Sequence, residues 1–303
     1  MIRASAEGWA RLTLLCSLAA AQLTLLVRSG LADFAIMASL SWLAGGLLLL
    51  EREEQGSNPP LQQLSGYRVV PALLLLLWSL LVLSRVARLY DPLLHLLPLA
   101  SLLGLGLLSG LAWRSTDLAS LGLIGALLPG QVLINRFLPT DALASLTAWI
   151  SSLLLWVLGR PAFSEGRNIL LNDKVLVVDA SCTGVNSMAL CLAAALVLVI
   201  LLPPPAGPPF PSRWPSVAAG LVLGLLAVVM AFFVNLLRIV LLAYTDFSPG
   251  LEGLAQWRSF SFWHEGLGSN LFSLMAMALT CLLWVLVLEL NLHHTRLMRS
   301  TKP

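Results

Sequence analysis

Residues 217–243 read VAAGLVLGLLAVVMAFFVNLLRIVLLA, an apolar run whose only charged side chain is that of Arg238. A helix needs about 20 mainly apolar residues to cross the hydrocarbon core of a bilayer. An arginine inside such a helix costs roughly 2.5–3.5 kcal/mol on insertion scales, so it normally faces a polar cavity or a partner. Asn235 lies three residues earlier on the same helix face. We therefore predict a membrane-spanning helix with one polar face, in preference to an arginine that merely extends to the membrane surface near Tyr244.

The composition extends this prediction to the whole chain. Of its 303 residues, 58% are hydrophobic and 11% are charged, whereas soluble domains carry about 25% charged residues. The expected fold is an all-α polytopic membrane protein with eight or nine transmembrane helices, surrounded by the lipid bilayer. The apolar runs place these helices near 9–27, 31–50, 69–84, 91–113, 118–136, 140–158, 183–203, 217–243 and 264–290. The net charge of +3 comes from dispersed basic residues, which excludes a nucleic-acid partner.

The runs divide the chain into three parts. Residues 1–136 are expected to form N-terminal transmembrane helices with little chemistry, and residues 137–290 a second group of helices that carries the polar motifs. Residues 291–303 form a basic tail. Because basic residues favour the cytoplasmic side of a membrane, we expect this tail in the cytoplasm.

A polar connection precedes the seventh run. Residues 161–181 contain two β-prone stretches, Asn168–Leu171 and Lys174–Val178, joined at Asn172-Asp173. This pattern predicts a short β-hairpin. The hairpin must lie outside the hydrocarbon, because lipid cannot satisfy open strand edges.

Three chemically reactive residues lie at ends of the last three predicted helices. Cys182 precedes the helix at 183–203, Arg238 lies near the end of the next, and His264 begins the last. A chain that crosses the membrane three times places these three points on the same side. With the tail in the cytoplasm, that side is the extracytoplasmic face.

The residue types suggest nucleophilic catalysis. Asp179 and Ser181 can cap a helix that begins beside Cys182, and a helix N-terminus favours a thiolate nucleophile. Gly184 permits another backbone to approach closely. Histidine titrates in the range that a base requires, although His264 alone would be ascribed to an aromatic membrane interface.

No metal site or organic cofactor is expected. The four cysteines form no C-x-x-C pair. The ordinary interpretation of three of them, which lie in apolar runs, is a small hydrophobic residue. Those three are Cys16, Cys191 and Cys281.

Three blocks resemble the signature blocks of the exosortases and archaeosortases. They are SCTGVNSMALCL at 181–192, VNLLRIVLLAY at 234–244 and FWHEGLGSN at 262–270. Their order and spacing are more specific than any one block, and the resemblance covers roughly residues 130–290. A departure is that Asn186 and Ser187 stand where many exosortases carry an arginine.

The resemblance implies a membrane-embedded cysteine protease or transpeptidase of the prokaryotic cytoplasmic membrane. Its partners would be membrane-anchored substrate proteins with a C-terminal sorting signal of the PEP-CTERM type. Cys182 would form a thioester with the substrate, Arg238 would hold the oxyanion or thiolate, and His264 would act as general acid and base. Supporting or substrate-binding roles are implied for Asn235, Gly184 and Asn186.

Other functions are compatible with the same residues. A transporter or flippase would line a substrate path with Arg238 and Asn235. A polyprenyl-phosphate glycosyltransferase would use an acidic base, for which Asp179, Asp246 and Glu265 are candidates. A rhomboid-type serine protease is disfavoured because no G-x-S-x-G element is present, and a purely structural protein leaves Arg238 unexplained.

Overall fold

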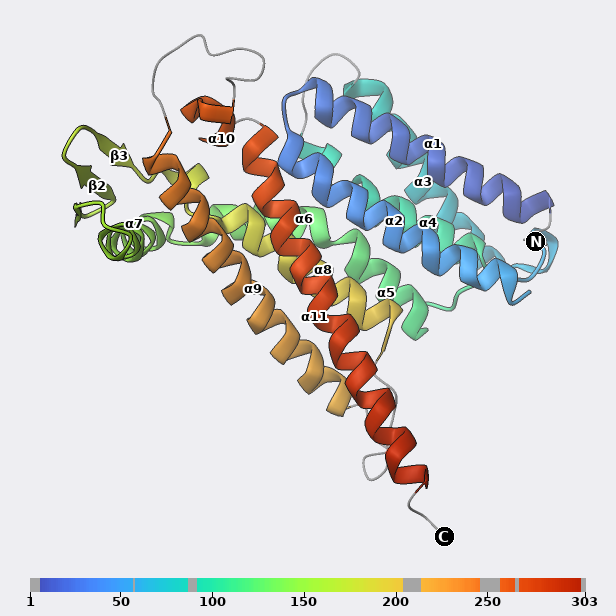
Figure 1. Ribbon diagram of the computed structural model, residues 1–303. Helices are drawn as coiled ribbons and strands as arrows, with labels where there is room; N and C mark the ends of the chain where they lie inside the picture. Colours follow the sequence, from blue (N-terminus) through green and yellow to red (C-terminus); the bar gives the residue numbers. More distant parts are fainter. Residues whose placement is uncertain are drawn as a thin grey trace. The chain divides into compact units, whose positions relative to one another are not determined.

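The computed structural model describes residues 6–56, 58–86, 92–203, 214–245, 257–264 and 267–300. Within these ranges helices dominate, and there is one small sheet (Figure 1). The chain divides into two compact units, Met1–Leu133 and Ile134–Pro303. The predicted all-α polytopic membrane fold is confirmed.

The first unit consists of helices joined by short turns. They are α1 (Ala6–Arg28), α2 (Ala32–Glu54), η1 (Leu61–Gln63), α3 (Gly66–Val86), η2 (Pro92–Leu96), α4 (Leu97–Leu108) and α5 (Thr116–Gly125), after which α6 (Leu127–Phe137) leads into the second unit. Gly30 ends α1 with a φ of +72°, a conformation that glycine adopts without strain. The Ser115 side chain caps α5 by accepting a 3.2 Å hydrogen bond from the Leu118 N–H.

Buried polar side chains in the first unit bind one another. Nη2 of Arg11 lies 2.7 Å from Oε1 of Glu53, and both side chains are less than 10% exposed. The Gln22 side chain donates to the Leu94 carbonyl at 2.7 Å and accepts from the Trp42 indole at 2.6 Å. These bonds join helices far apart in the sequence and satisfy groups that would be costly to bury alone.

Seven helices in the part of the chain that the structure describes are long and apolar enough to cross a membrane. An eighth candidate is the pair α5 and α6, which together pass the same test but are bent by 49°. The predicted transmembrane helix at 91–113 is represented by the shorter apolar segment Pro92–Leu108. The described residues therefore support the lower end of the predicted range of eight to nine.

The second unit contains a helical bundle and a sheet. Its elements are α7 (Thr140–Val157), β1 (Ala162–Glu165), β2 (Asn168–Leu171), β3 (Val175–Val177), η3 (Ala180–Cys182), α8 (Val185–Leu201), α9 (Trp214–Ala243), α10 (Phe260–His264) and α11 (Leu267–Ser300). The helices α8, α9 and α11 pack on one another. The sheet and α10 lie at the end of this bundle where α8 and α11 begin and α9 ends (Figure 1). Helix α11 continues to Ser300, through most of the tail expected at 291–303.

The predicted hairpin is part of a three-stranded antiparallel sheet with the order β1-β2-β3. Strands β2 and β3 pair as expected, with Ile169 opposite Leu176. The prediction missed β1, which pairs with β2 across a turn at Gly166. Ile169 and Leu176 are buried in the same apolar cluster as Cys182 and Ile239. The sheet therefore packs against the loop that carries the cysteine and against the end of α9.

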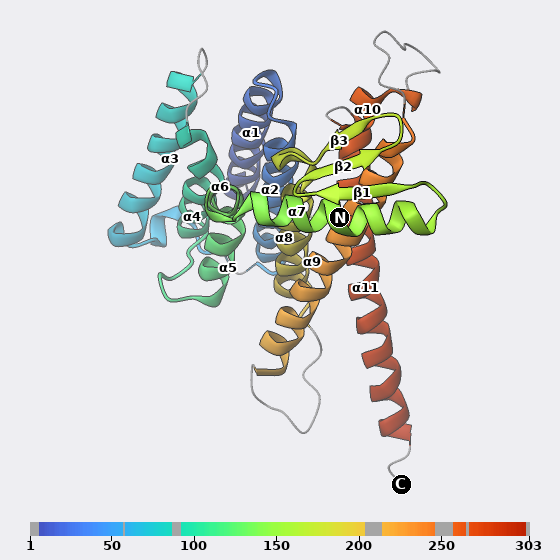
Figure 2. The ribbon, with the colours of Figure 1, turned by 90° about the vertical axis from the view of Figure 1, so that its left-hand side faces the viewer.

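Helix α7 runs across the bundle rather than along it. It lies beside the sheet and is nearly horizontal in Figure 2, where α11 is nearly vertical. Ala144, Ala148 and Leu155 are buried in the apolar cluster with the sheet, whereas Trp149 and Trp156 are more than half exposed. A helix is thus present at the predicted 140–158, but it lies across the bundle of α8, α9 and α11 instead of alongside these helices, and one of its faces supports the sheet.

Candidate active site

The loop between β3 and α8 forms a tight turn around Cys182. The Asp179 carboxylate accepts hydrogen bonds at Oδ1 from the Cys182 N–H at 3.0 Å and from the Ser181 hydroxyl at 2.6 Å. Asp179 thus caps η3, a role that its sequence position had suggested. Helix α8 begins only after Gly184, so Cys182 lies just before the helix, with a side chain that is 1% exposed.

Gly184 allows a close approach by Asn235. A Cβ atom at Gly184 would lie 2.7–2.8 Å from side-chain atoms of Asn235, and φ of Gly184 is +79°. Asn235 donates from Nδ2 to the Cys182 carbonyl at 2.8 Å. The expectation that Gly184 admits another backbone was therefore wrong in detail, since it admits a side chain that fixes the cysteine loop to α9.

His264 closes the site from α10. Its Nε2 lies 3.7 Å from Oδ2 of Asp179, and its ring stacks on Phe260 with centroids 4.8 Å apart. The Cys182 Sγ, a ring nitrogen of His264 and a carboxylate oxygen of Asp179 all lie within 4.8 Å of one another. The side chains of His264 and Asp179 are 12% and 47% exposed, so the carboxylate side of the cluster reaches solvent while the cysteine is buried.

Arg238 supports the main chain at His264. Its Nε donates to the Trp263 carbonyl at 3.0 Å, and its Nη2 donates to the His264 carbonyl. These carbonyls lie at the C-terminal end of α10, where a cation is favoured. One buried arginine therefore contacts the segment that carries the histidine.

Asp179 is held as a carboxylate. Burial opposes its ionisation, but hydrogen bonds from Ser181 and the Cys182 N–H, together with the nearby His264, outweigh burial and lower its pKa below the usual value. At neutral pH the negative charge therefore faces the imidazole ring. Asp179 can orient that ring and stabilise its protonated form.

Of the remaining residues considered in the sequence, Asn186 and Ser187 make contacts with other helices. The Asn186 side chain accepts a 2.9 Å hydrogen bond from Asn135, which ties α8 to α6. Ser187 bonds Ser273 across the α8–α11 contact at 2.6 Å. Asp246 and Glu265, the other proposed acidic groups, lie outside the described residues.

The sequence did not reveal the pairing of Asp179 with His264 or the stacking of Phe260. Asp179 was visible as a helix cap, three residues before Cys182, and as one of three candidate acidic bases, but not as a partner of His264. Its second oxygen reaches His264 because the loop and α10 meet in the folded chain. Spacing between residues 85 positions apart carries no signal for that contact.

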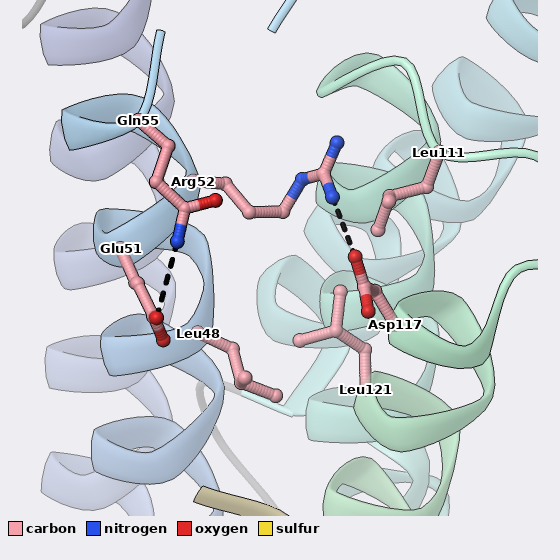
Figure 3. Close-up of a pocket in the computed structure, with 7 residues that line it drawn as sticks. All are labelled: Leu48, Glu51, Arg52, Gln55, Leu111, Asp117 and Leu121. Atoms are coloured by element: carbon pink, nitrogen blue, oxygen red, sulfur yellow. Dashed lines mark hydrogen bonds and ion pairs between the residues drawn. The ribbon is translucent and has the colours of Figure 1, made fainter. Parts of the chain in front are cut away.

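A separate pocket lies in the first unit. It has a volume of about 150 Å³ and is lined by Leu48, Glu51, Arg52, Gln55, Leu111, Asp117 and Leu121 (Figure 3). Arg52 binds Asp117 in it through an ion pair, and Gln55 donates to Glu51 at 3.1 Å. The pocket contains no cysteine, histidine or hydroxyl nucleophile, so the cluster around Cys182 is the better candidate for chemistry.

A comparison with known families assigns the chain as a whole. Residues 28–281 match the family described as "Transmembrane exosortase (Exosortase_EpsH)". The chain belongs to this family. The match includes Cys182, Arg238 and His264 and thus the whole cluster of this exosortase. Searches of curated proteins and of solved structures found no match.

Proposed function

We propose that this exosortase is a cysteine peptidase or transpeptidase that cleaves the C-terminal sorting signals of membrane-anchored proteins. The observation that carries the proposal is the cluster of Cys182, His264 and Asp179, whose reactive atoms lie within 4.8 Å of one another. A thiol, a base and a group that orients the base are the parts that nucleophilic catalysis requires.

The first half-reaction forms an acyl-enzyme. His264 takes the proton from the Cys182 thiol, and the thiolate attacks the carbonyl carbon of the scissile peptide bond. The carbon–nitrogen bond then breaks, and the leaving amine takes the proton from the imidazolium. The product is a thioester on Cys182, with the C-terminal part of the substrate released.

The second half-reaction reverses the proton transfers. An acceptor with an O–H or N–H group gives its proton to His264 and attacks the thioester. The Cys182 sulfur leaves and takes the proton back. Water as acceptor makes the enzyme a peptidase, and an amine makes it a transpeptidase.

Arg238 and Asn235 position these groups. Through its two carbonyl contacts Arg238 fixes the main chain at His264, and its charge favours the thiolate and the oxyanion of the tetrahedral intermediate. Asn235 holds the carbonyl of Cys182. Gly184 leaves the space that Asn235 occupies, while Asn186 supports the start of α8.

Access to the sulfur must change during the reaction. Since the Cys182 side chain is only 1% exposed, a bound peptide has to displace groups around the cluster. We place this site at the extracytoplasmic face of the prokaryotic cytoplasmic membrane, on the basis of the basic C-terminal tail. Substrates there would be exported proteins still anchored by their C-terminal helix.

Co-expression with a membrane-anchored protein that bears a sorting signal tests the proposal. The wild type is expected to give a product shortened at its C-terminus, and Cys182→Ser is expected to leave the precursor intact. Cys281→Ser is the matched control, because this partly buried cysteine lies in α11 of the same unit and should not alter processing. Normal processing by Cys182→Ser would rule out the cysteine mechanism.

The contacts of Arg238 bear on the two alternative functions. A transporter or a glycosyltransferase would need this guanidinium for a solute or a phosphate, whereas two of its nitrogens donate to main-chain carbonyls. Neither alternative requires a thiol beside His264. Transport or glycosyl transfer that persists in Cys182→Ser and is lost in Arg238→Ala would favour one of them.

A further inference from the structure

The cluster in the second unit also has the composition of a metal site. Cys182, His264 and Asp179 offer one sulfur, one nitrogen and one oxygen donor. Among the residues that the structure describes, this is the one group of three such side chains whose donor atoms lie close together. Thiolate, imidazole and carboxylate are the three ligand types that Zn²⁺ takes in proteins.

The distances are close to those of a tetrahedral ion. Zinc–ligand bonds of about 2.0–2.3 Å place neighbouring ligand atoms roughly 3.3–3.6 Å apart. Nε2 of His264 and Oδ2 of Asp179 are already 3.7 Å apart, and all three donors lie within 4.8 Å. Side-chain rotations that move the donor atoms by about 1 Å would bring all three within bonding distance of one ion.

The main chain holds the donors in place without using the atoms that would bind the ion. Asp179 and Cys182 belong to one turn, and Oδ1 of Asp179 closes that turn, so Oδ2 can bind an ion while the cap persists. His264 is held through its carbonyl by Arg238 and through its ring by Phe260. A site that is formed in advance loses little entropy on binding.

Charge decides which ions suit the site. The thiolate and the Asp179 carboxylate together balance a divalent cation, while Arg238 opposes binding by repulsion. Two backbone carbonyl oxygens on the guanidinium soften this repulsion. The sulfur selects a borderline-soft ion such as Zn²⁺, Co²⁺ or Cd²⁺ over Mg²⁺ or Ca²⁺, which prefer oxygen ligands.

We propose that Asp179, Cys182 and His264 form a reversible binding site for Zn²⁺, with the fourth position open to water, and that the bound ion blocks the enzyme. Binding replaces the thiol proton, which is released to solvent, and requires His264 to be neutral. The sulfur and the ring nitrogen are then engaged by the ion and are withdrawn from catalysis. The blocking part of this inference rests on the proposed function, whereas the binding part does not.

Titration of the purified full-length protein in detergent with Co²⁺ tests the binding part. The wild type is expected to develop a sulfur-to-cobalt charge-transfer band in the near ultraviolet and the strong visible bands of a tetrahedral ion, both removed by excess Zn²⁺. Cys182→Ser should lose the charge-transfer band, and Cys281→Ser should keep it. His264→Gln and Asp179→Asn should weaken binding by roughly 10-fold or more. Asp179→Asn keeps an oxygen that can cap the turn, so loss of binding in this variant is not a loss of the fold.

Two results would overturn the site: a wild type without the charge-transfer band, or the same band in Cys182→Ser. The blocking part is tested by Zn²⁺ added to the processing reaction, followed by a chelator. Zn²⁺ should stop processing and the chelator should restore it, while a chelator that abolishes processing would contradict a blocking role. Cobalt binding without any processing would contradict the proposed function and support the metal site. Processing without cobalt binding would support the proposed function and contradict the metal site.

Discussion

The two units of the protein arrange their interacting polar side chains in different ways. In the first unit Arg11 and Glu53 lie 2.7 Å apart, and Gln22 bonds on both sides, so these groups are within full hydrogen-bonding distance. In the second unit His264 stands 3.7 Å from Asp179, and their cluster with Cys182 spans up to 4.8 Å. The first arrangement joins helices. The second holds a thiol, an imidazole and a carboxylate near one another at distances longer than those of the Arg11–Glu53 pair.

The largest effect that would sharpen this comparison is expected at His264. His264→Gln should reduce processing of a sorting-signal substrate by roughly 10²–10⁴-fold, because the base that takes the thiol proton is lost. The measurement is the rate of product formation by purified protein in lipid vesicles. His95→Gln serves as control, since His95 is a buried histidine of the first unit whose ring is tilted against that of Phe34. A decrease of less than about tenfold for His264→Gln would contradict its assignment as the base.

At the ion pair of the first unit we expect a loss of stability without a loss of processing. Arg11→Met should lower the free energy of unfolding by about 3–5 kcal/mol, because Glu53 is left buried without its partner. The double variant Arg11→Met/Glu53→Leu should recover most of this loss, since an apolar pair can replace a buried ion pair. Denaturant unfolding in detergent measures both variants. Processing per folded molecule should be unchanged, and a specific loss of processing would break the division between the units.

A smaller effect, on the free energy of unfolding, is expected at Gly184, which is a structural residue close to the reactive cysteine. Gly184→Ala should destabilise the cysteine loop by more than the roughly 1–2 kcal/mol that a positive φ costs alanine, because its Cβ would overlap Asn235. Gly159→Ala is the matched control, with φ of +84° and open space around it. The difference between the two variants in unfolding free energy isolates the overlap. Equal values would mean that the loop moves aside and that Asn235 does not fix it.

The smallest effect concerns the acid range. The pKa of Asp179 is lowered in the folded protein, so its stabilising contribution is present above the ordinary carboxyl pKa of about 3.8 and is lost as pH falls through the folded value. Asp179→Asn removes this part of the pH dependence. Thermal unfolding of both proteins between neutral and acid pH measures it. Parallel pH profiles would show that the carboxylate contributes no pH-dependent stability.

The sequence predicted those parts of the fold that depend on local pattern. The length of the apolar runs identified the last three transmembrane helices, and helix parity placed Cys182 and His264 at one end of them. The pairing of β2 with β3 followed from the β-prone runs beside Asn172-Asp173. Each helix or strand signal is contained in a short run of consecutive residues, and helix parity follows from counting those runs.

Features that depend on distant contacts were missed. The β1 strand, AFSE, lacks a run of β-branched residues, and it is a strand because β2 offers it an edge. The bend between α5 and α6 near Ala126 and the crossing of α7 over the bundle have no local signature. The same holds for the contact of Asp179 with His264.

The hydrogen bonds from Arg238 to the main chain determine which substitutions this part of the site can tolerate. Its acceptors are the main-chain carbonyls of Trp263 and His264, which every amino acid supplies. Replacement of the indole at 263 would thus leave this contact available, while lysine at 238 would carry the charge without the planar fork that reaches two carbonyls. This contact therefore constrains the side chain at 238 and the path of the main chain at 263 and 264, and it places no requirement on the side chain at 263.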